Sequence, residues 1–312
     1  MFFSVKNVFL LGIFGFVLGA LAETSHLERL SLEAPYINHG MRNLWWEYGG
    51  STVIDRKNGI FLTQDVQNQQ GWISTRLPTP SSSFEVLFQF RINSESTSLF
   101  GDGLAFFLAA ERAKPGPVFG FTDKFNGYGI FIDTYNNHRP GTLFPRVIVM
   151  KGDGHTPYDY ENDGKANEIA SCSALNVRGN DYNLGKLKYD KNAKKLRFEI
   201  AYQGSSSFIK CFDLNEVELP LTTFMSFSAH TGDLSESHEI ASILSRTITD
   251  IDDEGTPEIP AEELKGTTYG QKKGSFKKRL IILLLSLIVI FSIFALRSYQ
   301  VQQEKNRRTT VL

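Results

Sequence analysis

Short β-strand patterns follow one another from about Ser25 to Thr249, and this succession constrains the fold more than any other feature of the sequence. From Phe84 to Ile92, apolar residues alternate with mostly polar ones, which is typical of a half-buried strand. Segments 187–189 and 196–202 flank a turn at 190–193 and predict a hairpin. Helical periodicity is nearly absent, so this part of the chain predicts an all-β domain.

Near-continuous apolar runs indicate further strands that are covered on both faces. They lie at Leu104–Leu108, Gly129–Ile132, Val147–Met150 and Phe224–Phe227. Many short strands separated by glycine, proline and asparagine turns predict a two-sheet sandwich of the jelly-roll kind. With 41% hydrophobic residues in 312, the chain can bury one core of this size.

Two apolar segments, one near each end of the sequence, predict a secretory route and a membrane anchor. Residues 1–22 combine Lys6 with an apolar run and the small-residue pattern Ala20-Leu21-Ala22, and predict a cleaved signal peptide rather than an N-terminal anchor. The uncharged segment 280–296, bracketed by basic residues, predicts a single transmembrane helix rather than a buried globular one. The predicted parts are a signal peptide at 1–22, a lumenal domain at 23–249, a stalk at 250–279, the transmembrane helix at 280–296 and a cytosolic tail at 297–312.

This order predicts a single-pass type I membrane protein whose large domain lies in the lumen. The acidic, proline-containing segment 250–263 favours a solvated stalk. A span as short as 280–296 favours the thinner membranes of the early secretory pathway. The net charge of −1 gives no indication of nucleic-acid binding.

The chain has two cysteines, Cys172 and Cys211, both on the predicted lumenal side. Because that compartment is oxidising, one disulfide is the natural interpretation. A reactive thiol is the alternative, but no basic or histidine-rich neighbourhood supports it.

Oxygen-bearing residues gather at the ends of apolar strands and predict a site for a hard cation such as Ca²⁺. Asp133 follows a buried run and can offer two carboxylate oxygens, while Tyr135 can offer a carbonyl and Asn137 an amide oxygen. Asp163 could complete the shell from another loop. Taken alone, an Asp-x-x-x-Asn pair at a strand end is more often a turn held by its own hydrogen bonds.

Two motif-like stretches are rejected as other metal sites. Asp159 to Gly164 begins like an EF-hand loop, but Ala170 stands where a bidentate glutamate belongs. His238-Glu239 begins like a zinc-protease motif, but the second histidine is missing, so we expect this pair to be structural.

Several landmarks stand in a fixed order along the chain and together resemble the L-type lectins of the secretory pathway, which are related to the legume lectins. The resemblance spans about His26 to Leu244 and implies the concanavalin-like form of the sandwich. The landmarks are Trp45-Trp46, Gly101-Asp102-Gly103-Leu104-Ala105, Pro115-Gly116-Pro117-Val118-Phe119-Gly120, Phe131-Ile132-Asp133-Thr134-Tyr135, the cysteine pair, and Thr231-Gly232-Asp233-Leu234-Ser235.

The resemblance implies a role for each candidate residue. Calcium would be held by Asp133, the Tyr135 carbonyl, Asn137 and Asp163. Mannose would be bound by Asp102, Asn137 and the backbone of Gly232, Asp233 and Leu234. The resemblance also implies a cis peptide bond between Gly101 and Asp102.

One position departs from the family pattern. Tyr160 stands where the mannose-binding members have a histidine, and its phenol can still form one hydrogen bond to a sugar. Tyr160 is therefore a sugar-binding candidate whose affinity or linkage preference can differ from that of histidine. His138 and His155 are weaker candidates for the missing imidazole.

The predicted function is a calcium-dependent lectin without enzymatic activity that binds high-mannose N-glycans. It would act as a cargo receptor or sorting lectin in membranes of the endoplasmic reticulum, the ER–Golgi intermediate compartment and the Golgi apparatus. Its partners would be high-mannose glycoproteins in the lumen and vesicle coat components. The coat would contact the tail, whose apolar end Val311-Leu312 is similar to the exit signals of related receptors or is simply a chain end.

Two alternatives remain open at this point. A lectin-like receptor with altered or lost sugar binding would recognise polypeptide, and Tyr160 is the only support for it. A glycoside hydrolase would need two carboxylates about 5 to 9 Å apart. The best candidate strand offers Glu85 alone.

Overall fold

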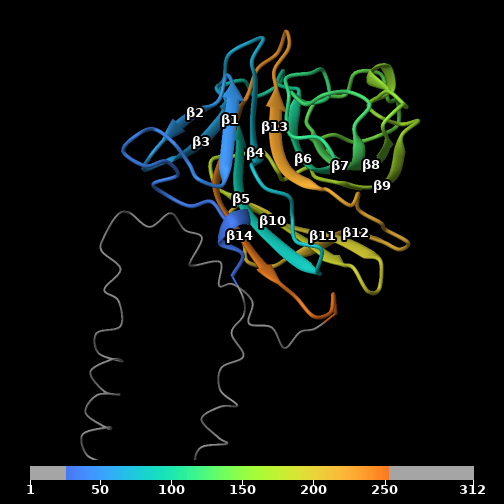
Figure 1. The fold of residues 1–312 in the computed structure, drawn as a ribbon. Coiled ribbons are helices and arrows are strands. Elements are labelled where there is room, and N and C mark those ends of the chain that lie inside the picture. Colours follow the sequence, from blue (N-terminus) through green and yellow to red (C-terminus); the bar gives the residue numbers. More distant parts are fainter. Residues whose placement is uncertain (1–25, 253–312) are drawn as a thin grey trace, which may run out of the picture. The chain divides into compact units, whose positions relative to one another are not determined.

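Two seven-stranded β-sheets face each other in the computed structural model, which describes residues 26–252 (Figure 1). The first sheet has the order β1 (Trp46–Gly50), β4 (Gln70–Thr75), β13 (Phe224–His230), β6 (Gly103–Ala109), β7 (Asn126–Asp133), β8 (Arg146–Asp153) and β9 (Glu168–Ser173). The second has the order β12 (Ile209–Leu214), β11 (Lys195–Ala201), β10 (Asn183–Asp190), β5 (Phe84–Asn93), β14 (Ser237–Thr247), β3 (Gly59–Thr63) and β2 (Val53–Asp55). Two short 3-10 helices, η1 (Glu28–Leu30) and η2 (Tyr160–Asn162), complete the described elements.

The predicted all-β two-sheet sandwich is confirmed. The four apolar runs form β13, β6, β7 and β8, which are four consecutive strands of the first sheet. The predicted hairpin is the antiparallel pair β10 and β11. The four apolar runs are buried on both faces because each face of the first sheet is covered there by a packed layer.

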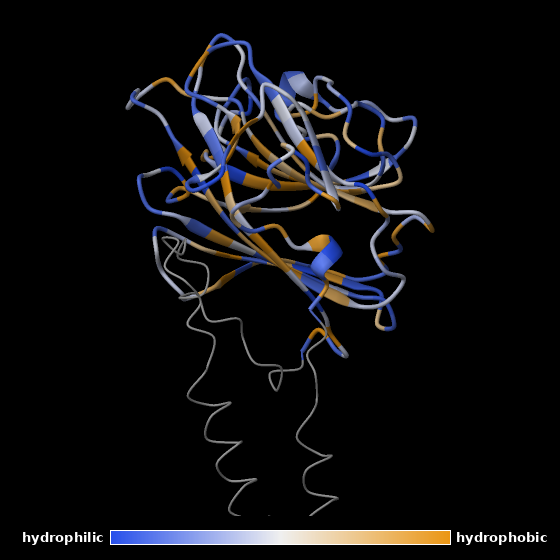
Figure 2. Ribbon diagram, turned by 60° about the vertical axis from the view of Figure 1, so that its left-hand side comes forward, coloured by the Kyte–Doolittle hydropathy of each residue, from blue (hydrophilic) through white to orange (hydrophobic). Residues whose placement is uncertain are grey.

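One of those layers is the core between the sheets. Phe88 of β5 contacts Phe106 of β6 and Phe227 of β13, with ring centroids 5.7 and 5.0 Å apart. Aromatic rings bury large apolar areas, so this cluster joins the two sheets through their central strands. The hydropathy colouring shows hydrophobic residues along the facing strands and hydrophilic ones along most of the loops (Figure 2).

The second layer is a loop that covers the other face of the first sheet. Phe119 and Phe121 from this loop stack on Phe131 of β7 and Phe107 of β6, with ring centroids 5.2 and 4.0 Å apart. Phe119 and Phe121 are 7% and 0% exposed. The loop therefore belongs to a packed cluster, and it forms one wall of the cleft described below.

The prediction of a strand from Phe84 to Ile92 is confirmed, but the prediction that it is half-buried is wrong, because β5 is buried on both faces. Glu85 is 2% exposed and forms ion pairs with Arg246 of β14 and Lys188 of β10. A central strand between two such neighbours can bury a carboxylate because the carboxylate is paired.

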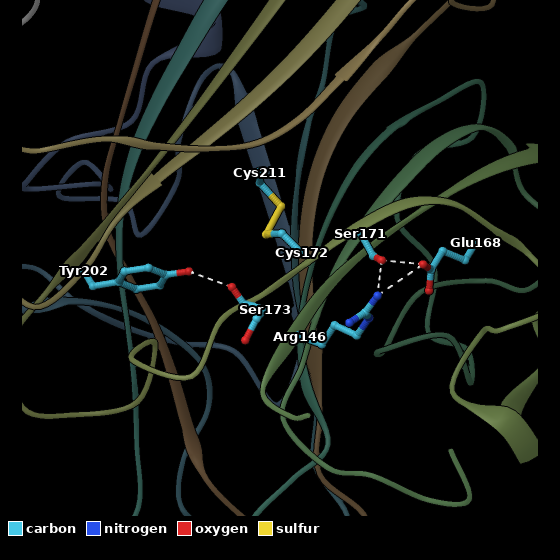
Figure 3. Close-up of a disulfide and its surroundings, with 7 residues drawn as sticks. All are labelled: Arg146, Glu168, Ser171, Cys172, Ser173, Tyr202 and Cys211. Carbon is cyan, nitrogen blue, oxygen red and sulfur yellow. Dashed lines mark hydrogen bonds and ion pairs between the residues drawn. A yellow bond between two sulfur atoms is a disulfide. The ribbon is translucent and has the colours of Figure 1, made fainter. Parts of the chain in front are cut away.

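The predicted disulfide is confirmed between Cys172 in β9 and Cys211 in β12 (Figure 3). These are edge strands of different sheets, so the bond ties the first sheet to the second at one margin of the sandwich. Beside it, Arg146 contacts Ser171 and Glu168, and the Tyr202 hydroxyl donates to the Ser173 carbonyl (Figure 3).

The predicted signal peptide, transmembrane helix and tail, together with all but the first residues of the stalk, lie outside residues 26–252. Within those residues, no helix has the length and apolar character needed to cross a bilayer.

Candidate functional site

A cleft of about 250 Å³ opens where three neighbouring strands of the first sheet begin or end. Asp102 immediately precedes β6, Asp133 is the last residue of β7, and His230 is the last residue of β13. Gly103 pairs with both Asp133 and His230 in the strand register, which brings these side chains to one edge of the sheet. The lining residues are Asp102, Pro117, Phe119, Asp133, Asn137, Tyr158, Tyr160 and His230.

Asp102 is held in place by its backbone. Its amide donates to the His230 carbonyl at 3.1 Å, and its carbonyl accepts from the amide and the hydroxyl of Thr134, each at 3.0 Å. The Gly101–Asp102 peptide bond is cis, as the resemblance implied. With its backbone fixed and its side chain 37% exposed, Asp102 presents a carboxylate to the cleft.

The predicted Gly232–Leu234 segment lies beside Asp102. A Cβ atom on Gly232 would come within 3.4 Å of Asp102 Oδ2, so the backbone passes close to the carboxylate. The Gly232 carbonyl accepts from the Asn68 amide at 3.1 Å, and the Asp233 carbonyl accepts from Gln67. The loop is therefore anchored by its carbonyls, while the Asp233 side chain is exposed.

The four predicted calcium ligands lie in two loops that hydrogen bond to each other. Asp133 and Asp163 are 3% and 1% exposed. Asp163 Oδ1 accepts from the Asn137 amide at 3.0 Å and from Asn137 Nδ2 at 2.7 Å, an arrangement that leaves the Asn137 amide oxygen for another partner. Asp133 Oδ1 accepts from the Tyr135 amide at 3.1 Å. The structure thus brings all four residues together.

The electrostatics of this cluster of carboxylates favour a bound cation. Burial, and then the neighbouring Asp163, raise the pKa of Asp133 well above its ordinary value, and Asp102 and Glu236 add to the effect. Burying one carboxylate beside another is costly unless a positive charge lies close to them. A bound cation would remove that cost, because it makes the ionised form favourable.

The donor set also matches the ligand preferences of Ca²⁺, which binds carboxylate, amide and carbonyl oxygens. Among residues 26–252, no three His, Cys, Asp or Glu side chains are grouped in a way that would hold a metal ion. Only Asp133 and Asp163 of the candidate ligands belong to those residue types. The residues present fit a hard cation and do not fit a zinc-like site.

A buried carboxylate supports the cleft from behind. Glu236 is fully buried and accepts hydrogen bonds from the Thr134 hydroxyl and from Arg178 Nε, the latter at 3.0 Å. Thr134 in turn bonds to the Asp102 carbonyl, so Glu236 connects the loop after β7 to Asp102. His238 lies 3.1 Å from Glu236 and 2.6 Å from the Thr63 hydroxyl, and the structural role expected for it is confirmed.

Tyr160 and Tyr158 form an aromatic wall of the cleft. Their rings are 5.1 Å apart and nearly perpendicular, and Tyr160 is 38% exposed. Burial, followed by the nearby Asp123, raises the pKa of Tyr160, so its hydroxyl stays protonated and can donate. Tyr158 is 6% exposed, and its hydroxyl has no hydrogen-bond partner within the described part of the chain.

Several cleft residues were missed by sequence reasoning, above all His230. The signal that could have found it is its position directly before the Thr231–Ser235 landmark. Neither weaker imidazole candidate lines the cleft: His138 contacts Asp163 Oδ2 through its backbone amide, and the amide of His155 caps a turn at Asp153. Pro117, Phe119 and Tyr158 reach the cleft only through tertiary packing.

A chain of polar contacts joins the loop at Asp163 to the edge strand that carries Cys172. Arg139 Nη1 donates to the Asp163 carbonyl at 3.4 Å, and Arg139 Nη2 lies 2.6 Å from Glu168 Oε2. Glu168 also contacts Ser171 and Arg146 (Figure 3). Burial alone would raise the pKa of Glu168, but the bonds from Ser171 and Arg139 outweigh it and lower that pKa.

Replacing Glu168 by glutamine is expected to lower the free energy of unfolding of the calcium-free protein by about 1–2 kcal/mol at neutral pH, between the values for exposed and buried pairs. The pKa of Glu168 is lower in the folded protein than its ordinary value of 4.5. The stability that the carboxylate contributes is therefore present above pH 4.5 and is lost as the pH falls through the folded pKa. Urea unfolding of both proteins between pH 3 and pH 7 measures it.

The matched control is replacement of the exposed Glu161 by glutamine, which should change stability by less than about 0.5 kcal/mol. A Glu168→Gln effect that stayed constant over the whole pH range would show that the carboxylate charge contributes nothing.

Comparisons with known proteins add independent information. The model of the legume-like lectin family matches residues 23–255. The human VIP36-like protein is 34% identical over 219 residues, which are 68% of this chain and 62% of that protein. The mouse vesicular integral-membrane protein VIP36 is 29% identical over 311 residues, which are 91% of this chain and 85% of that protein.

A solved structure shows the same fold. The exoplasmic/lumenal domain of VIP36, in its form with Ca²⁺ and Man3GlcNAc bound, superposes with a TM-score of 0.65 and 32% identity. The match covers 75% of this chain and 95% of that domain. This chain therefore covers nearly all of a lumenal domain but only 62% of the VIP36-like protein.

Proposed function

This chain belongs to the legume-like lectin family, and we propose that it is a calcium-dependent lectin that binds high-mannose N-glycans. The observation that carries the proposal is the single cleft that contains Asp102, Asp133 and Asn137. The VIP36 domain with the same fold was solved with Ca²⁺ and a mannose oligosaccharide, which supports the same ligands here. The family consists of lectins, so the expectation that the chain is not an enzyme is confirmed.

Asp133, the Tyr135 carbonyl, Asn137 and Asp163 would hold the calcium ion. Bound calcium would supply positive charge next to the two buried carboxylates. Asn137 belongs to both parts of the site, since its amide nitrogen bonds to Asp163 while the residue lines the cleft. The metal loop and the sugar cleft are therefore coupled through one side chain.

Asp102 would accept hydrogen bonds from the hydroxyls of a mannose residue, and the backbone amides of Gly232 to Leu234 would donate to them. Charge-assisted bonds of this kind are about twice as strong as neutral ones. A cleft of about 250 Å³ is smaller than the roughly 300–1,000 Å³ of sites for drug-sized ligands, which suits one terminal sugar of a larger glycan.

The glycoside hydrolase alternative has little support in the structure. Its candidate Glu85 lies in the second sheet and is buried in ion pairs with Arg246 and Lys188. The polypeptide-binding alternative rested on Tyr160, yet Tyr160 lines the same cleft as Asp102 and Asn137. A phenol in this place supports an altered sugar contact rather than a lost one.

We place this lectin in the early secretory pathway as a cargo receptor or sorting lectin for glycoproteins. Support comes from the predicted signal peptide at 1–22 and membrane span at 280–296, and from relatives named as vesicular integral-membrane proteins. The domain would lie in the lumen at 23–249, and the tail at 297–312 would contact vesicle coat components.

A glycan array probed with the purified protein tests this function. With calcium present, binding should be confined to mannose-terminated oligosaccharides and should disappear with a chelator. Product formation would point instead to an enzyme, and binding to neither sugar nor calcium would favour a polypeptide receptor.

Replacing Tyr160 by phenylalanine is expected to weaken mannoside binding about 3- to 10-fold, the equivalent of one hydrogen bond. The ring, and its packing on Tyr158, would be kept, so calcium affinity and thermal stability should not change. Calorimetric titration of both proteins with methyl α-mannoside measures the change. Unaltered mannoside affinity would remove Tyr160 from the sugar contacts.

A further inference from the structure

His230 places an imidazole directly against the sugar-binding aspartate. It is the last residue of β13 and pairs with Gly103 in the strand register, so its side chain lies beside Asp102. His230 Nδ1 is hydrogen-bonded to Asp102 Oδ2, and the two side chains are 24% and 37% exposed. Both residues line the cleft.

The chemistry of this contact determines which ring nitrogen is protonated. A carboxylate can only accept a hydrogen bond, so His230 Nδ1 must carry the proton. In the neutral imidazole, Nε2 then has a free lone pair and is an acceptor. Asp102 Oδ1 and His230 Nε2 therefore form two neighbouring acceptors, whereas adjacent hydroxyl groups of a sugar provide two neighbouring donors.

We propose that His230 is a sugar-binding residue, whose Nε2 accepts a hydrogen bond from a saccharide hydroxyl next to the one bound by Asp102. The inference rests on the proposed mannose-binding function and adds one sugar-contacting residue to that site. It also assigns the imidazole of this cleft to the end of β13, whereas Tyr160 lies in the 3-10 helix η2. Because the contact depends on vicinal hydroxyls, it makes His230 a determinant of which sugars fit.

Three variants separate direct binding from the positioning of Asp102. In His230→Asn, the amide nitrogen lies near the place of Nδ1 and can still donate to Asp102, but nothing replaces Nε2. In His230→Gln, the amide reaches toward the place of Nε2, but the bond to Asp102 is lost. In His230→Ala, both are removed. The exposed His155→Ala is the matched control.

The experiment titrates the full chain, purified in detergent, with methyl α-mannoside at saturating calcium. We expect His230→Ala to weaken binding at least 10-fold and His230→Asn about 5- to 10-fold, while His155→Ala and the calcium affinity of every variant stay unchanged. Wild-type affinity in His230→Asn would overturn the proposal, because it would mean that His230 only orients Asp102. Loss of calcium affinity in His230→Ala would overturn it too.

A spectroscopic measurement tests the same contact without mutation of the ring. In protein labelled with ¹⁵N-histidine, His230 is assigned by the signals that disappear in His230→Asn. We expect its Nε2 signal to shift when mannoside is added, whereas an unchanged signal at saturation would refute direct contact. If the wild-type protein bound no mannoside at all, the proposed function would fail first, so the two failures can be told apart.

Discussion

Replacement of Asp102 by asparagine is expected to raise the dissociation constant for mannosides by about 100-fold or more while calcium binding is retained. Asp102 contributes charge-assisted hydrogen bonds, each of which is worth about 1.5–3 kcal/mol. Asparagine keeps the shape but has one oxygen acceptor, and that oxygen would also be needed by His230. Every 1.4 kcal/mol is a factor of ten in affinity, so two lost bonds account for the predicted factor.

Calorimetric titrations of the Asp102→Asn protein with calcium and then with mannoside measure both parts of this prediction. The backbone of Asp102 is held by Thr134 and His230 and does not depend on the carboxylate, so the fold should be unchanged. Asp181→Asn is a suitable control because its side chain is exposed and does not line the cleft. Near-normal mannoside affinity in Asp102→Asn would show that the carboxylate is not the principal sugar ligand.

Replacement of Asp133 by asparagine is expected to abolish calcium binding at millimolar concentrations, and mannoside binding with it. Asp133 is the central carboxylate of the predicted ligand set, and its burial leaves no room for a different donor. In the calcium-free state the same change should stabilise the protein, because burial and Asp163 raise the pKa of Asp133 and make its charge unfavourable.

The two effects have opposite signs, which makes the Asp133→Asn prediction specific. Thermal unfolding in chelator should show a higher midpoint for the variant than for the wild type. Added calcium should then stabilise only the wild type, by about 2.7 kcal/mol at 100 times the dissociation constant. The exposed Asp153→Asn should keep the normal calcium response, and a calcium-induced shift in Asp133→Asn would contradict the assignment.

Much of the fold could be predicted because local pattern and tertiary environment agree. The runs at Leu104–Leu108 and Gly129–Ile132 are apolar on both faces, and each lies between two layers. Cys172 and Cys211 could be paired because the chain has no other cysteine. In contrast, the burial of Glu85 depends on Arg246, which is distant in sequence and adjacent only through the pairing of β5 with β14.

The site shows the same division. Asp133, Tyr135 and Asn137 lie within five residues of one strand end, so their shared direction follows from the chain itself. Asp102 and His230 are far apart in sequence and meet only because β13 pairs with β6 in one particular register. The residues around His230 do not indicate with which strand, or in which register, β13 pairs. A histidine at a strand end does not by itself indicate a binding site.

The central claim is that calcium organises the cleft in which mannose binds. Its most direct test is to measure oligomannose affinity by calorimetry as a function of free calcium, from chelator to saturation and back. We predict that binding is undetectable in chelator, appears as calcium is added, and is fully reversible. An oligomannose affinity that is the same in chelator and in saturating calcium would contradict the claim.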